Sequence, residues 1–300
     1  MTAAEFRQKL ALGTAQFGLA YGINNTHGRP ADATVAAVLA EARTAGLTLL
    51  DTAAAYGDSE ARLGQWLSEQ AEASFGVVTK VAAAAPAVVR SAVQASLARL
   101  QLPQVYGVLF HDFNALQQQP AAWQGLQASR AAGLTARIGI SLYHPWQAQW
   151  LLDRRGWDVD LLQVPYNVLD QRFATVLPAL AARGVEVHVR SAFLQGLLLR
   201  PLDALPTYFE PLRPRLTQLR TLTAEAGIPL EATLLLFAAT APGVSRVVIG
   251  VDTAANLRAN VAAAQYLTPF SALRPSLAGL LETREELLLP YRWPKTHAAD

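Results

Sequence analysis

Three ionisable side chains each stand at or near the end of an apolar run in the sequence. Asp51 ends the run GLTLLD, Lys80 lies within FGVVTKVA, and His111 follows VYGVLF, while Tyr56 comes five residues after the aspartate. Singly, each has a structural explanation: a turn cap, a half-buried aromatic, a lysine that reaches solvent, or a core histidine bonded to a carbonyl. Together, they form a set that supports acid–base chemistry.

A phenol, an ammonium group and a carboxylate can act together as a proton donor. A free phenol titrates near ~10, and a neighbouring ammonium favours its phenolate form. We expect Lys80 to supply this charge beside Tyr56, Asp51 to hold the lysine, and His111 to orient a carbonyl oxygen. A proton donor aimed at a developing alkoxide is what reduction of an aldehyde or ketone by hydride requires.

Eight short runs alternate with helical patterns along the chain, and these elements must position the four residues. Most of the runs are continuously apolar, which is typical of parallel strands covered on both faces. Predicted helices cover 33–45 and begin at Pro86, and Gly46, Gly133 and Gly184 are expected to end helices. The runs are KLALGTA, GLTLLDTA, FGVVTKVA, VYGVLFHD, TARIGISLY, LLQVPYN, VEVHVRSAF and SRVVIGVD.

This rhythm predicts an α/β fold, a (β/α)8 TIM barrel, as a single domain over residues 1–300. An open doubly wound sheet is the alternative, but no GxGxxG follows the first strand. Two segments break the rhythm: an insertion around 200–227, helical over 212–226, and a C-terminal extension over 271–300 with a helix at 282–289. In such barrels, catalytic groups lie just past the carboxyl ends of the strands.

The composition restricts the other classes of function. The 300 residues are 52% hydrophobic and 16% charged, and the net charge of +2 does not indicate a nucleic acid or a membrane surface as partner. The absence of cysteine excludes disulfides, thiol catalysis and cysteine metal sites, and no HxH or HExxH pair indicates a metal site. No run approaches the ~20 apolar residues of a membrane span, and Glu5 is unlike a signal peptide, so a cytoplasmic protein is expected.

Seven ordered motifs resemble the aldo-keto reductases, which are (β/α)8 barrels that use a nicotinamide cofactor. They are LGTAQFG, DTAAAYG, VVTK, SLARL with LFH, RIGIS, QVPYN and RSAFLQGLL. LGTAQFGLAYGINN is also similar to bacterial members described as aldose dehydrogenases. The resemblance implies a catalytic set of Asp51, Tyr56, Lys80 and His111, with Tyr56 as acid in reduction and base in oxidation.

The resemblance also implies a cofactor site along the later strand ends. Ser141 and Gln163 match residues that bind the nicotinamide carboxamide, LQG matches a loop around the pyrophosphate, and IGVDTAAN matches the turn near the adenosine phosphate. NADPH is expected from the family, and NADH stays open because Asp252 would repel a 2′-phosphate; Arg258 is a substitute cation. The implied residues are Gly13, Thr14, Ser141, Gln163, Arg190, Ser191, Phe193, Gln195, Gly196, Gly250, Asp252, Asn256 and Asn260.

The chain departs from the family pattern at two positions. Leu142 replaces an asparagine that many relatives place after the serine, and Arg190 replaces an aromatic residue that stacks on the nicotinamide. A guanidinium can stack as well, or bind a phosphate or an acidic substrate. Gln16 and Asp112 favour a polar substrate such as a sugar. The residues expected to line the substrate pocket are Gln16, Phe17, Tyr21, Phe113, Tyr143 and Trp293.

Two other classes of function stay open. Some relatives keep the fold and bind the cofactor as regulatory subunits without catalysis, and turnover separates these from enzymes. Hydrolysis by a carboxylate pair, Asp51 and Asp112, would leave Lys80 and Tyr56 without roles. For a reductase, the expected partner is a small carbonyl compound or a sugar.

Overall fold

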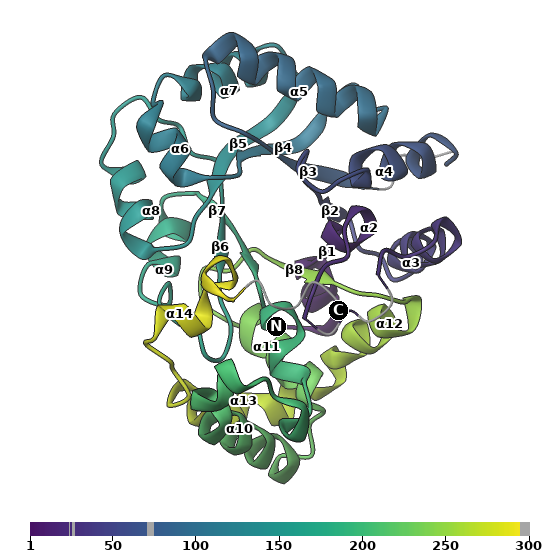
Figure 1. The fold of residues 1–300 in the computed structure, drawn as a ribbon, viewed down its shortest axis with the longest axis vertical. Coiled ribbons are helices and arrows are strands. Elements are labelled where there is room, and N and C mark those ends of the chain that lie inside the picture. Colours follow the sequence, from purple (N-terminus) through teal and green to yellow (C-terminus); the bar gives the residue numbers. More distant parts are fainter. Residues whose placement is uncertain (24, 26–27, 71–74, 295–300) are drawn as a thin grey trace.

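Eight parallel strands close into a barrel, and the predicted fold class is confirmed. The computed structural model describes residues 1–23, 25, 28–70 and 75–294. The strands pair in chain order, and the first also pairs with the eighth (Figure 1). They are β1 (Leu10–Gly13), β2 (Leu49–Asp51), β3 (Gly76–Val81), β4 (Val105–Phe110), β5 (Thr135–Ser141), β6 (Leu161–Pro165), β7 (Glu186–Arg190) and β8 (Arg246–Gly250). Each lies within one of the eight predicted runs.

Helices surround the strands on the outside of the barrel (Figure 1). The predicted helix over 33–45 is α3 (Asp32–Thr44), and the helix at Pro86 is α5 (Pro86–Leu100). The others that follow the strands are α4 (Ser59–Ser68), α6 (Phe113–Gln118), α7 (Ala122–Ala131), α8 (Pro145–Leu152), α9 (Leu177–Ala182), α11 (Leu230–Ala239) and α12 (Ala254–Ala262). Gly46, Gly133 and Gly184 have φ of 77°, 73° and 76°, the left-handed conformation that ends helices.

The core has two parts, one on each face of the sheet. The larger lies between strands and helices and includes Leu12, Val77 and Ile138. The smaller fills the barrel interior and contains Ala11, Leu49, Val78, Leu109 and Leu161. The interior is thus packed rather than hollow, so a ligand is confined to the ends of the barrel.

The two segments outside the barrel rhythm are built from short helices. The insertion begins with two 3-10 turns, η2 (Leu202–Ala204) and η3 (Thr207–Leu212), and continues as α10 (Arg213–Glu225), close to the predicted helix. The boundary placed at residue 271 falls inside α13 (Leu267–Ala278). The helix expected over 282–289 is only the turn α14 (Glu285–Leu288), because the Glu282 carboxylate accepts from the N–H groups of Thr283 and Arg284 and makes a turn there.

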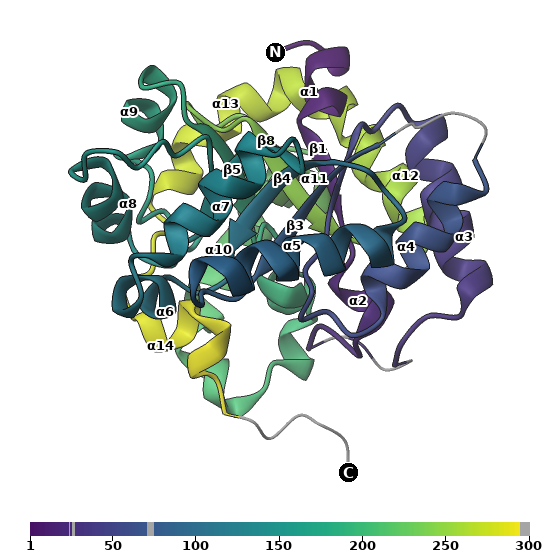
Figure 2. The same cartoon turned by 90° about the horizontal axis from the view of Figure 1, so that it is seen from above.

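The two ends of the barrel are covered differently. Helix α1 (Ala3–Lys9) lies at the end where the strands begin, whereas α2 (Ala15–Gly18), α6 and α14 lie at the other end (Figure 2). The strands therefore run toward the end that carries α2, α6 and α14. In the part of the chain that the structure describes, no single helix is long and apolar enough to cross a membrane; only a pair bent by 97°, Thr207–Glu225 with Leu230–Ala239, reaches that length and composition together.

Candidate active site

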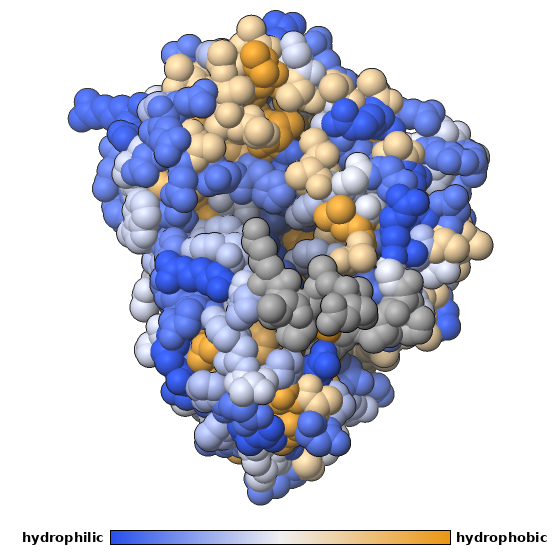
Figure 3. Space-filling view, in the orientation of Figure 1, coloured by the Kyte–Doolittle hydropathy of each residue, from blue (hydrophilic) through white to orange (hydrophobic). Residues whose placement is uncertain are grey.

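A cleft of about 470 Å³ lies at the carboxyl ends of the strands. The space-filling view shows this face hollowed near its centre (Figure 3). The cleft is lined by Asp51 and Tyr56 and by every residue of the predicted cofactor set except Ser141, which is 3% exposed on β5. Residues from the ends of β1, β2, β6, β7 and β8 thus meet in one place.

A buried ion pair lies at the base of the cleft. The ammonium Nζ of Lys80 donates to Asp51 Oδ1 at 2.7 Å and to the carbonyl of Thr52 at 2.9 Å. The amide of Gln163 donates to the other carboxylate oxygen of Asp51 at 2.7 Å. The side chains of Lys80 and Asp51 are only 1% and 4% exposed, so both oxygens of the carboxylate are held by the protein.

The lysine and the histidine lie on two sides of the tyrosine. Lys80 Nζ is 5.2 Å from the centroid of the Tyr56 ring, and the His111 ring packs edge-on against Tyr56 with centroids 5.7 Å apart. The four residues predicted from the sequence are therefore neighbours. Lys80 and His111 lie behind Tyr56 and Asp51, which line the cleft themselves.

The charges of this group follow from its burial. Burial alone would lower the pKa of Lys80, but the attraction of Asp51 and Tyr56 outweighs it, and the pKa is raised above its ordinary value. For His111, burial and the positive charges of Lys80 and Arg190 lower the pKa to about 4. The lysine is therefore an ammonium and the histidine a neutral imidazole near pH 7, so His111 has one N–H to donate.

Close backbone contacts hold the loop that carries Tyr56. Gly57 has φ of 55°, and a Cβ there would lie 2.4 Å from the carbonyl oxygen of Gly18. A Cβ on Gly18, in α2, would lie 1.8 Å from the carbonyl oxygen of Tyr56. Since real Cβ contacts are never so short, glycine is required on both sides. The motif DTAAAYG contains Gly57, but nothing in the sequence shows that Gly18 lies against it.

A buried hydroxyl network, which sequence reasoning missed, connects the loop after β1 with the loop between β2 and α4. Ser59 Oγ donates to Thr14 Oγ1 at 2.9 Å, lies 3.1 Å from Thr52 Oγ1, and Thr14 Oγ1 donates to the Asp51 carbonyl at 3.0 Å. All three residues are buried. Thr14 thus positions the aspartate from below as well as lining the cleft.

The loop after β7 forms one wall of the cleft. Ser191, Leu194, Gln195 and Gly196 all have positive φ, between 47° and 92°. Buried Asn167 on the preceding loop donates from its amide to the Ser191 carbonyl at 3.0 Å and fixes the start of this turn. Within the turn, the N–H of Leu194 donates to the Ser191 carbonyl and that of Gly196 to the Phe193 carbonyl, which fixes its shape as a wall of the cleft.

The opposite wall is formed by β8 and the start of α12. Thr253 caps α12 by accepting from the N–H of Asn256 at 3.1 Å. Asn260 lies one turn further and is buried. A cleft that runs from Tyr56, past the turn after β7, to the amino end of a helix has the donors that a nicotinamide dinucleotide requires. The residues present therefore fit this cofactor.

Arg190, at the end of β7, lines the cleft and is held by residues that follow β5. Its guanidinium is 4.2 Å from the centroid of the Tyr143 ring and donates to the Leu142 carbonyl at 3.2 Å. Leu142, which replaces the asparagine of relatives, thus holds Arg190 through its backbone. Within the described residues, Arg190 has no carboxylate partner.

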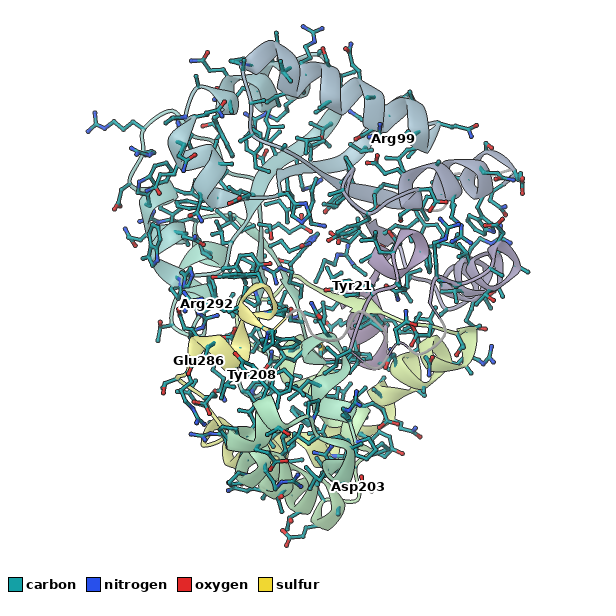
Figure 4. The ribbon with its side chains drawn as sticks, viewed as in Figure 1. Tyr21, Arg99, Asp203, Tyr208, Glu286 and Arg292 are labelled. Carbon is teal, nitrogen blue, oxygen red and sulfur yellow. The ribbon has the colours of Figure 1, made fainter. Side chains whose placement is uncertain are left out.

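Of the other residues predicted to contact substrate, some line the cleft and some do not. Tyr21 lines the cleft, beside the barrel mouth (Figure 4), and its hydroxyl accepts from Gln195 at 3.2 Å; burial of the hydroxyl, together with Tyr56, raises the pKa of Tyr21 to about 12. Gln16 also lines the cleft, but its amide donates to the Val251 carbonyl. The residues that do not line the cleft are Phe17 and Phe113, which are core residues, Tyr143, and Trp293, which packs on Phe209.

The arrangement does not suit a carboxylate pair. The Asp112 carboxylate caps α6, where it accepts from the N–H of Asn114 at 2.7 Å, and Asp51 is taken by Lys80 and Gln163. Asp112 does not line the cleft. Among the described residues, no group of three or more His, Asp or Glu side chains could hold a metal ion.

Solved structures with the same fold carry related descriptions. A protein from Pseudomonas aeruginosa that has been assigned to the aldo-keto reductases is 26% identical, with a TM-score of 0.67, over 87% of this chain and 90% of its own. The aldo-keto reductase AKR11C1 from Bacillus halodurans, in its holo form, is 22% identical, with a TM-score of 0.70, over 88% and 91%. No curated protein matches significantly. The model of the aldo/keto reductase family matches residues 9–272, so this chain belongs to the aldo/keto reductase family.

Proposed function

We propose that this chain interconverts an aldehyde, ketone or sugar lactol with its alcohol or lactone by hydride transfer, with Tyr56 as the proton donor and acceptor. Members of the family typically use NAD(P)H. The observation that carries the proposal is the buried Lys80 ammonium, fixed by Asp51 and 5.2 Å from the Tyr56 ring. The likeness of LGTAQFGLAYGINN to aldose dehydrogenases supports sugars as test substrates.

Each residue has a distinct role in this mechanism. In reduction, a bound nicotinamide would supply hydride to the carbonyl carbon. The Tyr56 hydroxyl would give its proton to the carbonyl oxygen, which gains negative charge as the hydride adds. Lys80 favours the phenolate that remains, and Asp51 keeps Lys80 charged and in place. Neutral His111 donates its N–H to the carbonyl oxygen and orients it. Oxidation reverses the steps, with Tyr56 as base.

The cofactor would be held by the walls of the cleft. Gln163 lies at the end of β6 and lines the cleft next to the acid–base group, where a carboxamide can be bound. Its neighbour Ser141, at the end of β5, is buried and does not line the cleft. The positive amino end of α12 would attract the phosphates, and the turn over 191–196 would enclose them from the other wall. A cofactor held in this way would bring its hydride donor to the carbonyl group that Tyr56 protonates.

Replacement of Tyr56 by phenylalanine tests the proposal. We expect kcat/KM for a panel of aldehydes and sugars, followed by nicotinamide absorbance, to fall by about 10²–10⁴-fold, with the dissociation constant of the cofactor unchanged. Tyr208→Phe is the matched control, because it removes a phenol that does not line the cleft and whose hydroxyl donates to the Glu286 carbonyl; it should keep most of the activity. Cofactor binding without turnover by the unmodified chain would indicate a binding subunit instead, and an unchanged rate in Tyr56→Phe would remove Tyr56 from the mechanism.

A further inference from the structure

We propose that the cleft selects a nicotinamide dinucleotide without a 2′-phosphate, so that NADH binds more tightly than NADPH. This inference rests on the proposed function and replaces the expectation of NADPH that the sequence resemblance gave. Because the nicotinamide must lie beside Tyr56, the adenosine end must lie at the opposite end of the same cleft, where β8 meets α12 and α11 begins.

The residues at this end are acidic or neutral. Glu231, in the first turn of α11, and Asp252, directly after β8, both line the cleft and are exposed to solvent. Asn256 and Asn260 are the other polar side chains there. Within the described residues, the only cation that lines the cleft is Arg190, and it lies at the nicotinamide end against Tyr143.

The nearest arginines are directed elsewhere. Arg258 lies on α12 but pairs with Glu41 of α3 at 2.6 Å, outside the cleft, so it does not substitute for the basic residue of NADPH-dependent relatives. Arg200 follows the wall of the cleft, but it donates to the carbonyls of Ala204 and Ile23. The partners of these two guanidiniums named here, Glu41, Ala204 and Ile23, do not line the cleft.

The charge balance favours a ribose hydroxyl over a phosphate. A 2′-phosphate carries a charge of about −1.5 to −2 at pH 7. A carboxylate about 7 Å away in water weakens its binding by about 7-fold before screening by salt. A 2′-hydroxyl can instead donate a hydrogen bond to a carboxylate, the arrangement by which other dinucleotide folds recognise NAD. Glu231 and Asp252 therefore weaken the binding of NADPH and favour the binding of NADH.

Direct binding to the full chain tests this inference without any substrate. Fluorescence titration at low salt should give a dissociation constant for NADH that is at least about 10-fold lower than that for NADPH. The difference between the two dissociation constants should become smaller as salt is added. Adenosine 5′-phosphate should displace NADH at lower concentration than adenosine 2′,5′-bisphosphate, which isolates the adenosine end. The Asp252→Asn and Glu231→Gln changes together should lower the ratio of the NADPH dissociation constant to the NADH dissociation constant about 10-fold. Asp252→Lys should make NADPH bind more tightly than NADH.

The control is Asp203→Asn, which removes one negative charge, as each single neutralisation in the cleft does. Asp203 lies on η2, far from the barrel mouth (Figure 4), so the cofactor ratio should be unchanged. NADPH binding as tightly as NADH, or a ratio unaffected by the cleft variants, would overturn the inference and leave the reductase proposal standing. Binding of neither cofactor would overturn both.

Discussion

The pair of Lys80 and Asp51 allows a stability prediction with a defined dependence on pH. Asp51→Asn keeps the shape of the side chain but leaves a buried ammonium without its counter-charge. Breaking a buried pair on one side costs about 3–5 kcal/mol. The lysine can escape this cost by losing its proton, which limits the loss to about 4.6 kcal/mol at pH 7 and about 1.9 kcal/mol at pH 9, given an unfolded pKa of about 10.4.

The sign of the pH dependence is opposite in the two proteins. The raised pKa of Lys80 in the unmodified chain gives stability that is fully present below the unfolded pKa and lost above the folded one. In Asp51→Asn, the folded pKa is lowered, so stability rises as pH increases toward 10. The difference between the two chains should therefore shrink from pH 7 to pH 9.

Thermal unfolding at pH 7 and pH 9 measures this difference. A chain of this length unfolds with an entropy of about 0.6 kcal/mol per K, so we expect Tm to fall by about 5–7 °C at pH 7 and by no more than about 3 °C at pH 9. Asp51→Asn with Lys80→Met removes both charges and should recover most of the loss.

The matched control for the buried pair is Asp58→Asn, which breaks an ion pair of the same length, 2.7 Å, with Arg29. Its side chains are 51% and 42% exposed, so about 0–1 kcal/mol is expected. A Tm loss in Asp51→Asn that is equal at both pH values, or no larger than in Asp58→Asn, would refute the reasoning.

Two further predictions concern the neighbours of Tyr56. Gly57→Ala should lower kcat/KM by about 10-fold or more, because the added Cβ would push the loop away from Gly18. Misplacement of a catalytic group by about 1 Å lowers the rate by up to about 10²-fold. The control is Gly133→Ala, which should keep its activity because Gly133 is also left-handed but has nothing within 4 Å of an added Cβ. Because the pKa of His111 is lowered to about 4, the free energy of unfolding should fall as pH drops from about 6.5 toward 4; chemical denaturation should show His111→Asn to lack that part of the slope, and equal slopes would contradict this placement.

The barrel, and the closeness of the residues at its strand ends, could be predicted because both are encoded locally. A continuous apolar run that ends in a charged residue marks a strand end, and Asp51, Lys80 and His111 each carry that signal within a few residues. Parallel strands then bring the three ends together without further information.

The features that could not be predicted depend on pairs of residues remote in the sequence. The contact of Gly18 with Tyr56 requires α2 to lie on the loop after β2, and neither segment indicates the other. Glu231 lies in no recognised motif, and only the folded chain brings it to the same cleft as Asp252. The side of α12 from which Arg258 projects is likewise settled by Glu41 on α3.

The order of the strands divides the two tasks of the site along the chain. The acid–base group comes from β2, β3 and β4, whereas most of the cofactor cleft comes from β6, β7 and β8, and the bond from Gln163 to Asp51 joins the two halves. Glu231 and Asp252 lie more than a hundred residues after His111. Under the proposed function, mutations in the later half of the gene could therefore change the choice between NADH and NADPH. The acid–base residues encoded by the earlier half would stay unchanged.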